Sequence, residues 1–245
     1  MKASDMQPSA VVIGVGAEDG LGAALARRFA KGGFHVLVAG RTAAKVERVA
    51  ASLGAGNGTP FAMDATREDE VSHLFRLAAA PGAGKASASV VIFNAGNNQH
   101  IPFLELSAAQ FEAFWRVGCL AGFLAGREAA RLLLPQRAGT ILFTGASASL
   151  RGRPGFVQFS AAKAGLRMLS QSMARELGPH GIHVAHVLID GRINSKRLQA
   201  ESAHSVDAAG LLDAEAIAEA YWQLHVQHPS AWTQELDLRP FKEPF

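Results

Sequence analysis

The sequence is poor in cysteine and in charge, and it lacks any long apolar run. Its single cysteine, Cys119, cannot form a disulfide within the chain, which is typical of a protein in a reducing compartment. No segment approaches the roughly 20 apolar residues that a membrane-spanning helix needs. The first ten residues hold no apolar run of signal-peptide length. We therefore expect a cytoplasmic protein with no membrane partner.

Charged residues make up only 18% of the 245 residues, and the formal net charge at pH 7 is +3. The basic residues are scattered, whereas a nucleic-acid interface gathers them in a run or on one face. We therefore expect no nucleic-acid partner. A hydrophobic content of 49% is enough for a sizeable core, and α/β chains of this length are commonly one domain.

Short β-branched runs alternate with longer patterns rich in Ala and Leu, which is typical of βαβ units around a parallel sheet. They predict strands at residues 10–15, 34–39, 59–63, 90–93, 140–144, 183–189 and 234–238. They predict helices at 20–31, 43–53, 67–80, 108–134, 156–177 and 214–225. We therefore expect one Rossmann-type domain over residues 1–245, with a doubly wound parallel sheet in three α/β/α layers. Residues 1–9 are expected to be a tail, 81–89 a flexible surface loop, and 191–210 an irregular flap over a site.

A glycine-rich turn, Gly14 to Gly22, stands directly after the first predicted strand. Glycines permit a tight turn and let the backbone approach a pyrophosphate, while the next helix presents unpaired N–H groups to that anion. Glycines also serve ordinary strand-to-helix turns, but this position between a strand and a helix favours dinucleotide binding.

Several further motifs follow in order, and together they resemble those of the classical short-chain dehydrogenase/reductase family over nearly the whole chain. Val15–Gly22 is similar to the family's T-G-A-x-x-G-[IL]-G, and Phe93–Gly96 to its N-N-A-G. Phe159–Lys163 is similar to Y-x-x-x-K, and Asp190–Ser195 to P-G-x-[VI]-x-T. Together, the turn and the resemblance imply these cofactor-binding residues: Gly16, Gly20, Leu21, Gly22, Arg41, Asp64, Ala65, Asn94, Ala95, Gly96, Lys163, Gly191, Ile193 and Ser195. The resemblance also implies a homodimer or homotetramer, because two helices of relatives pack against their copies in another subunit.

The second predicted strand ends at Arg41 without an acidic residue. A carboxylate there would accept hydrogen bonds from a ribose 2′-OH, whereas a guanidinium suits a 2′-phosphate. Arg41 therefore favours NADP(H), unless it is an ordinary solvated charge. NAD(H) stays open, because the charges of Glu18 and Asp19 in the glycine-rich turn would oppose a phosphate.

The resemblance implies that a Tyr phenol, a Ser hydroxyl and an Asn would carry the proton chemistry, beside a Lys that holds the nicotinamide ribose. By spacing, these positions hold Phe159, Ala146 and Cys119, and only Lys163 is kept. A general acid typically contributes ~10²–10⁴ in rate, and Phe159 has no proton to give. A hydrogen-bond donor to the developing oxyanion contributes ~10²–10³, and Ala146 has none.

Neighbouring hydroxyls and other polar residues remain as candidates. Ser147 or Ser160 could replace a lost hydroxyl, although adjacent residues on a strand face opposite sides and on a helix lie about 100° apart. Cys119 could be a nucleophile or a small buried hydrophobe. His183 and His186 are three apart on a strand and so face opposite sides, and we expect no metal site. His100 could reach a substrate pocket or be an ordinary loop histidine. In the flap, the basic residues could mark an anionic ligand or be solvated: Arg192, Lys196, Arg197 and His204.

Two functions follow from intact cofactor motifs beside missing proton donors. The first is an NADP(H)-dependent oxidoreductase of atypical mechanism that transfers hydride to a small molecule, such as an iminium or an enone. The second is a catalytically inactive dinucleotide-binding homologue that acts as a sensor or an oligomer subunit. Loss of the cofactor site as well, given Val15, Glu18 and Asp19, is a third alternative.

Overall fold

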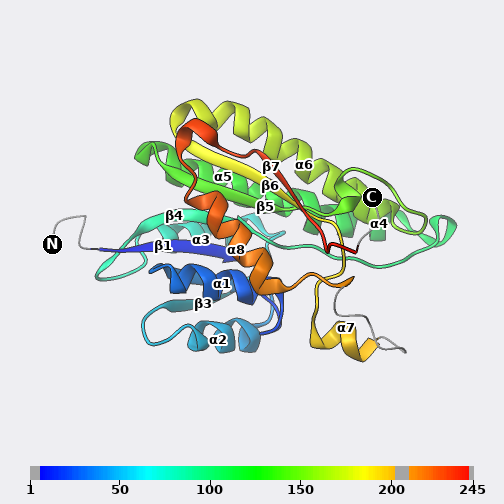
Figure 1. Ribbon diagram of the computed structural model, residues 1–245, viewed down its shortest axis with the longest axis horizontal. Helices are drawn as coiled ribbons and strands as arrows, with labels where there is room; N and C mark the ends of the chain where they lie inside the picture. The colour runs from blue at the N-terminus through cyan, green and yellow to red at the C-terminus, as the bar shows by residue number, and fades with distance from the viewer. Residues whose placement is uncertain (1–5, 202–209, 243–245) are drawn as a thin grey trace.

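The computed structural model describes residues 6–201 and 210–242, and in these residues seven strands form one parallel sheet (Figure 1). The strands are β1 (Gln7–Ile13), β2 (His35–Gly40), β3 (Gly58–Ala62), β4 (Lys85–Phe93), β5 (Gly139–Thr144), β6 (Ile182–Ile189) and β7 (Glu235–Leu238). Their order across the sheet is β3-β2-β1-β4-β5-β6-β7, and every neighbouring pair is parallel. The predicted doubly wound Rossmann-type sheet is confirmed.

Helices cover both faces of this sheet. They are α1 (Leu21–Lys31), α2 (Ala43–Ser52), α3 (Glu68–Ala79), α4 (Ala108–Trp115), α5 (Ala121–Leu133), α6 (Val157–Leu177), α7 (Lys196–Glu201) and α8 (Ala214–His225). One buried cluster packs α1, α2 and α8 against the sheet, and a second packs α3, α5 and α6 against the opposite face. Because helices cover both faces, the central strands are apolar on both sides. No helix of the described part of the chain is both long and apolar enough to cross a bilayer.

The strand order reverses at β1, whose neighbours are β2 on one side and β4 on the other. In doubly wound sheets the crossovers on either side of this point run in opposite directions. A crevice therefore opens beyond the carboxyl ends of the strands, and ligands of such folds bind there.

Two strands begin earlier than their apolar runs predict. β1 starts at Gln7, so the tail expected over residues 1–9 is at least three residues shorter, and residues 1–5 lie outside the described part. β4 starts at Lys85, inside the segment expected to be a flexible loop. The backbone N–H of Gln7 donates to the carbonyl of Gly84 at 2.9 Å, and Gln7 pairs with Lys85. These half-buried strand ends tolerate polar residues, which is why hydrophobicity alone missed them.

The helix predicted over residues 108–134 is interrupted by a π-helical turn, η3 (Arg116–Leu120). A side chain at Gly118 would place its Cβ 2.8 Å from Cβ of Ala162 on α6. One and two turns further on, Gly122 and Gly126 would press a Cβ against side chains of the same helix, Leu166 and Met173. A stripe of glycines therefore lets η3 and α5 approach α6 closely.

The segment expected to be an irregular flap contains helix α7, so that prediction is wrong for residues 196–201. A backbone bridge between Ile193 and Leu212 ties its first part to the segment before α8. His204 lies outside the described residues.

Candidate functional site

A cleft lies at the carboxyl ends of β1, β2 and β4, where the strand order reverses. Its lining includes seven of the predicted cofactor residues: Gly16, Arg41, Asp64, Ala65, Asn94, Ala95 and Gly96. Gly14 also lines it with φ of +94°, and a Cβ there would lie 2.6 Å from the backbone N of Ala95. Only glycine lets the chain turn this tightly beside the β4 wall.

The first turn of α1 faces this glycine-rich turn. Its N-cap is Gly20, which has no side chain to accept a hydrogen bond from the first N–H groups, and the first helical turn carries no acidic residue. A Cβ at Gly16 would meet nothing within 4 Å, so its backbone faces open space in the cleft. Free N–H groups, a positive helix end and exposed glycine backbone are the donors that a diphosphate requires. The residues present therefore fit the diphosphate of a nicotinamide dinucleotide.

The remaining predicted cofactor residues lie around this lining rather than in it. Gly20, Leu21 and Gly22 form the start of α1. Gly191, Ile193 and Ser195 lie between β6 and α7, and Asp19 of the glycine-rich turn accepts the backbone N–H of Lys196 at 2.5 Å. This contact brings the flap next to the glycine-rich turn.

At the end of β2 the cleft is basic. Arg41, Thr42 and Lys45 line it together. Lys45 was missed from the sequence, although its place one helical turn beyond Arg41 was a usable signal. The acid that would oppose a phosphate, Glu18, accepts a hydrogen bond from Nε of Arg48 at 2.9 Å. The negative charge of Glu18 is therefore offset by the positive charge of Arg48.

Lys163 is buried on α6 behind the β4 wall. Its Nζ donates to the carbonyl of Thr144 at 2.7 Å and to that of Ala95 at 3.4 Å. A Cβ at Gly96 would lie 3.1 Å from Nζ, so the missing side chain of Gly96 leaves the amine next to the cleft. Burial lowers the pKa of Lys163 to about 8.

The three substituted family positions lie on three separate elements. Phe159 is half-buried on α6, one turn before the lysine, and Ala146 follows the end of β5. Cys119 lies on η3, with its Sγ 2.8 Å from the Cβ position of Gly165 on α6. Burial raises the pKa of the Cys119 thiol, which disfavours the reactive thiolate.

The single tyrosine of the chain does not replace the missing phenol. Tyr221 on α8 is fully buried, and its hydroxyl bonds Oγ1 of Thr144 at 2.7 Å. It packs in the cluster on the α1 and α8 face, opposite to the face that carries Lys163. Burial raises the pKa of its hydroxyl.

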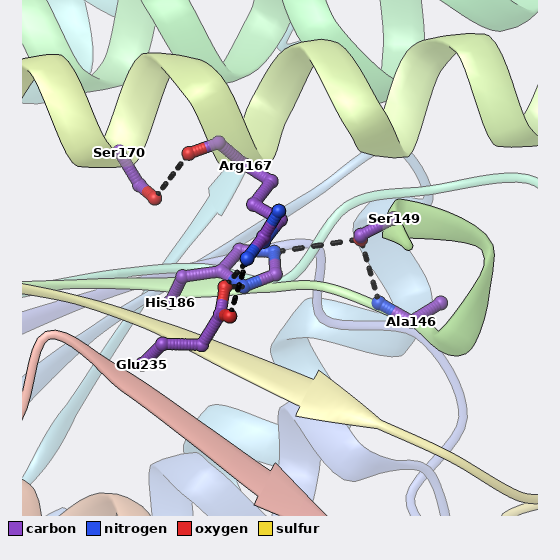
Figure 2. Close-up of polar contacts among 6 residues, drawn as sticks. All are labelled: Ala146, Ser149, Arg167, Ser170, His186 and Glu235. Carbon is purple, nitrogen blue, oxygen red and sulfur yellow. Dashed lines mark hydrogen bonds and ion pairs between the residues drawn. The ribbon is translucent and has the colours of Figure 1, made fainter. Parts of the chain in front are cut away.

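A buried polar network supports the loop that carries Ala146 (Figure 2). Nδ1 of His186 lies 3.1 Å from Oε2 of Glu235. The same carboxylate accepts two hydrogen bonds from Arg167, at Oε2 from Nε (2.6 Å) and at Oε1 from Nη2 (2.8 Å). Nε2 of His186 lies 3.5 Å from Oγ of Ser149, and that oxygen accepts the backbone N–H of Ala146 at 3.2 Å.

Burial lowers the pKa of His186 to about 4, so the imidazole is neutral at pH 7. Its Nδ1–H therefore donates to Glu235, and Nε2 accepts the Ser149 hydroxyl. The network therefore supports residues 145–150, which we call the catalytic loop because Ala146 stands there at the position of the family's catalytic serine. Ser149 and Glu235 were both missed from the sequence.

The other candidate residues are placed as follows. Ser147 begins the 3₁₀ turn η5 (Ser147–Ser149), and Oγ of Ser160 is buried without a hydrogen-bond partner. His100 is exposed and packs edge-on against Phe156. His183 stacks on Trp232, on the opposite face of β6 from His186, and the described residues contain no cluster suited to a metal.

Comparisons with known proteins agree with this geometry. A family model described as short chain dehydrogenase matches residues 10–205. A short-chain dehydrogenase structure from Rhodopseudomonas palustris is 41% identical, with a TM-score of 0.82, and the match covers 96% of this chain and 99% of that one. A metagenomic short-chain oxidoreductase in complex with NADP is 25% identical, with a TM-score of 0.78, over 97% and 99% of the two chains.

The very-long-chain 3-oxoacyl-CoA reductase of Podospora anserina is 30% identical over 181 residues. The match covers 71% of this chain and 52% of the reductase, so the chain spans about half the length of that relative. The family model alone matches most of the chain, and the fold and the glycine-rich cleft agree with it. The chain belongs to the short-chain dehydrogenase family of oxidoreductases, which bind NAD(P).

Proposed function

We propose that this protein is an NADP(H)-dependent oxidoreductase of atypical mechanism that transfers hydride to a small molecule. The observation that carries the proposal is the pair of cations, Arg41 and Lys45, in a cleft whose glycine-rich turn fits a diphosphate. Arg41 and Lys45 would hold the 2′-phosphate, and Lys163 the nicotinamide ribose. When bound, the nicotinamide supplies the hydride.

The mechanism differs from that of the family because no phenol can give a proton. Hydride transfer itself needs only a positioned donor and acceptor. An iminium acceptor needs no proton, and an enone can be protonated at carbon by water. The ring of Phe159 would suit a cation through its face. The name of the Podospora relative refers to a 3-oxoacyl thioester, so ketones belong in the same test.

Calorimetric titration with NADPH and with NADH tests the cofactor. Each charge-assisted hydrogen bond to a phosphate contributes about 1.5–3 kcal/mol, so Arg41→Ala with Lys45→Ala should weaken NADPH binding by about 100-fold or more. NADH binding should change little. Arg76→Ala is the matched control, because Arg76 is an exposed cation on α3 away from the cleft. Equal loss for both coenzymes, or no binding of either, would refute the proposal.

A second function is supported by the joint loss of three polar groups at Phe159, Ala146 and Cys119. In it the protein binds the dinucleotide without catalysis, as a sensor or an oligomer subunit. The double variant Phe159→Tyr with Ala146→Ser separates this function from the oxidoreductase. If the wild type binds NADPH tightly but only the double variant turns over substrate, the result favours a catalytically inactive wild type. Turnover of any ketone, imine or enone by the wild type would favour the oxidoreductase.

We also propose a homodimer or homotetramer. Apolar side chains are exposed on α4, α5 and α6, the helices that pack between subunits in relatives: Phe111, Trp115, Phe123 and Met168.

A further inference from the structure

We propose that the ammonium group of Lys163 itself gives the proton to the acceptor's oxygen, so that the substrate is a neutral ketone or enone and not an iminium. This inference rests on the proposed function and narrows its substrate class. It assigns to Lys163 a direct role, in contact with the reacting oxygen, in place of the hydroxyls that Phe159 and Ala146 cannot supply.

The first support is the charge balance around the amine. Among the described residues, both hydrogen-bond partners of Nζ are backbone carbonyls, those of Thr144 and Ala95, and no carboxylate pairs with it. The nearby ionisable side chains His186 of β6, Cys119 of η3 and Tyr221 of α8 are all neutral at pH 7 because of burial. Beyond His186, the carboxylate of Glu235 is paired with Arg167. The amine therefore places an unpaired positive charge in an interior site.

An unpaired buried cation discriminates between acceptors. It repels an iminium that is already cationic, and the repulsion is strong where water does not screen it. It stabilises an oxygen on which negative charge develops, as in carbonyl or enone reduction. This electrostatic preference is why we exclude the iminium.

The second support is access. An ammonium has three N–H groups, and among the described residues two of them have acceptors. We assign the third N–H to the acceptor's oxygen, in place of the nicotinamide ribose. Gly96 lines the cleft, and a Cβ there would come within 3.1 Å of Nζ. Because Gly96 has no side chain, no atom of a side chain at this position lies between the amine and the cleft.

The step balances without further reagents. The acceptor carbon gains a C–H bond and the electron pair of the hydride, and the π pair of the acceptor moves onto its oxygen. That oxygen forms an O–H bond as one N–H bond of Lys163 breaks. When bound, the nicotinamide would supply the two electrons by which the acceptor is reduced, and the neutral lysine would regain a proton from water. With an enone the first product is an enol, which becomes the ketone.

The proton is transferable near neutral pH, because burial lowers the pKa of Lys163 to about 8. A lysine in water, with a pKa of about 10.4, would hold its proton more strongly. Reduction requires the ammonium form, so kcat should fall as the pH rises above about 8.

The first measurement needs neither cofactor nor substrate. Protein labelled with ¹³C at lysine Cε is titrated by NMR, with the Lys163 resonance assigned by its absence in Lys163→Arg. We expect a midpoint near pH 8. A midpoint at the ordinary value of about 10 would overturn the proposal.

The second measurement separates proton donation from ribose binding. Lys163→Arg keeps a cation but cannot lose a proton, and Lys163→Met keeps the length without the charge. With folding verified by thermal melting, we expect kcat on ketones or enones to fall at least 100-fold in Lys163→Arg, while the calorimetric Kd for NADPH stays within about threefold. The alkaline fall of kcat should disappear in this variant.

Three results would overturn the inference. The first is a kcat kept by Lys163→Arg while NADPH binding weakens tenfold, which would make Lys163 a ribose clamp only. The second is faster wild-type turnover of imines than of ketones and enones. The third is no wild-type turnover of ketones and enones despite tight NADPH binding. Absence of NADPH binding by the wild type would instead refute the proposed function itself.

Discussion

The buried histidine behind the catalytic loop should make the fold sensitive to acid. His186 is fully buried, and burial lowers its pKa from the usual 6.5 to about 4. The charged groups that face it are Glu235, Lys163 and Arg167. Below pH 6.5 the unfolded chain binds a proton at this position and the folded chain does not, so the free energy of unfolding falls as the pH falls. The loss is complete only below about pH 4.

The size of the effect follows from the difference in pKa. A difference of one in pKa corresponds to about 1.4 kcal/mol, so lowering the pH from 8 to 4.5 should cost about 2.5 kcal/mol through His186. We predict that His186→Gln, which keeps a polar group between Ser149 and Glu235, loses about 2.5 kcal/mol less than the wild type over this range. Other buried histidines, such as His225, contribute equally to both proteins and cancel.

Urea unfolding followed by circular dichroism at several pH values measures this difference. His100→Gln is the matched control, because it replaces an exposed histidine, packed edge-on against Phe156, that lies outside the buried network. The reasoning fails if His186→Gln and the wild type lose the same stability between pH 8 and 4.5.

Three further predictions concern the cleft, the chain near it and the assembly. Gly14→Ala should abolish measurable coenzyme binding and lower the melting temperature, because a side chain there meets the backbone of Ala95 in a left-handed conformation; unchanged NADPH calorimetry would contradict it. Asp213→Ala should lower the free energy of unfolding by about 1 kcal/mol and Asp213→Asn by much less, since the Asp213 side chain accepts the N–H of Ala216 at the start of α8; equal melting curves for the two variants would argue against the cap. Trp115→Glu should reduce the assembly mass in sedimentation velocity, and a wild type that sediments as a monomer would refute the proposed oligomer.

Much of the fold could be predicted because its signals are local. The helix at Ala214–His225 was predicted with the bounds that the structure has, because its pattern rich in Ala is a local signal. The strand at His35–Gly40 is buried throughout and apolar after its first residue, as a central parallel strand should be. Hydrophobicity failed where a strand extends beyond its buried part, as at Lys85, and it gave no sign of the π-helical turn η3 or of helix α7.

The candidate site likewise has a part that could be predicted from the sequence and a part that could not. The glycine-rich turn and Arg41 follow strands directly in the sequence, so their place at the carboxyl edge of the sheet was predictable. The polar network was not, because His186 and Glu235 are 49 residues apart and meet only as register partners of β6 and β7. Ser149 reaches the same imidazole from a turn after β5. No local sequence pattern indicates which strands are neighbours in the sheet.

The glycines of η3 and α5 limit how this protein can be made more stable. In an ordinary exposed helix, Gly→Ala adds up to about 1 kcal/mol, and thermostabilisation campaigns use it routinely. At Gly122 a methyl group would lie 2.3 Å from Cδ1 of Leu166, and the helix on the other side of that contact carries Lys163. Replacing Gly122 by alanine to stabilise α5 would therefore push against α6 and displace the amine of Lys163, on which the proposed chemistry depends.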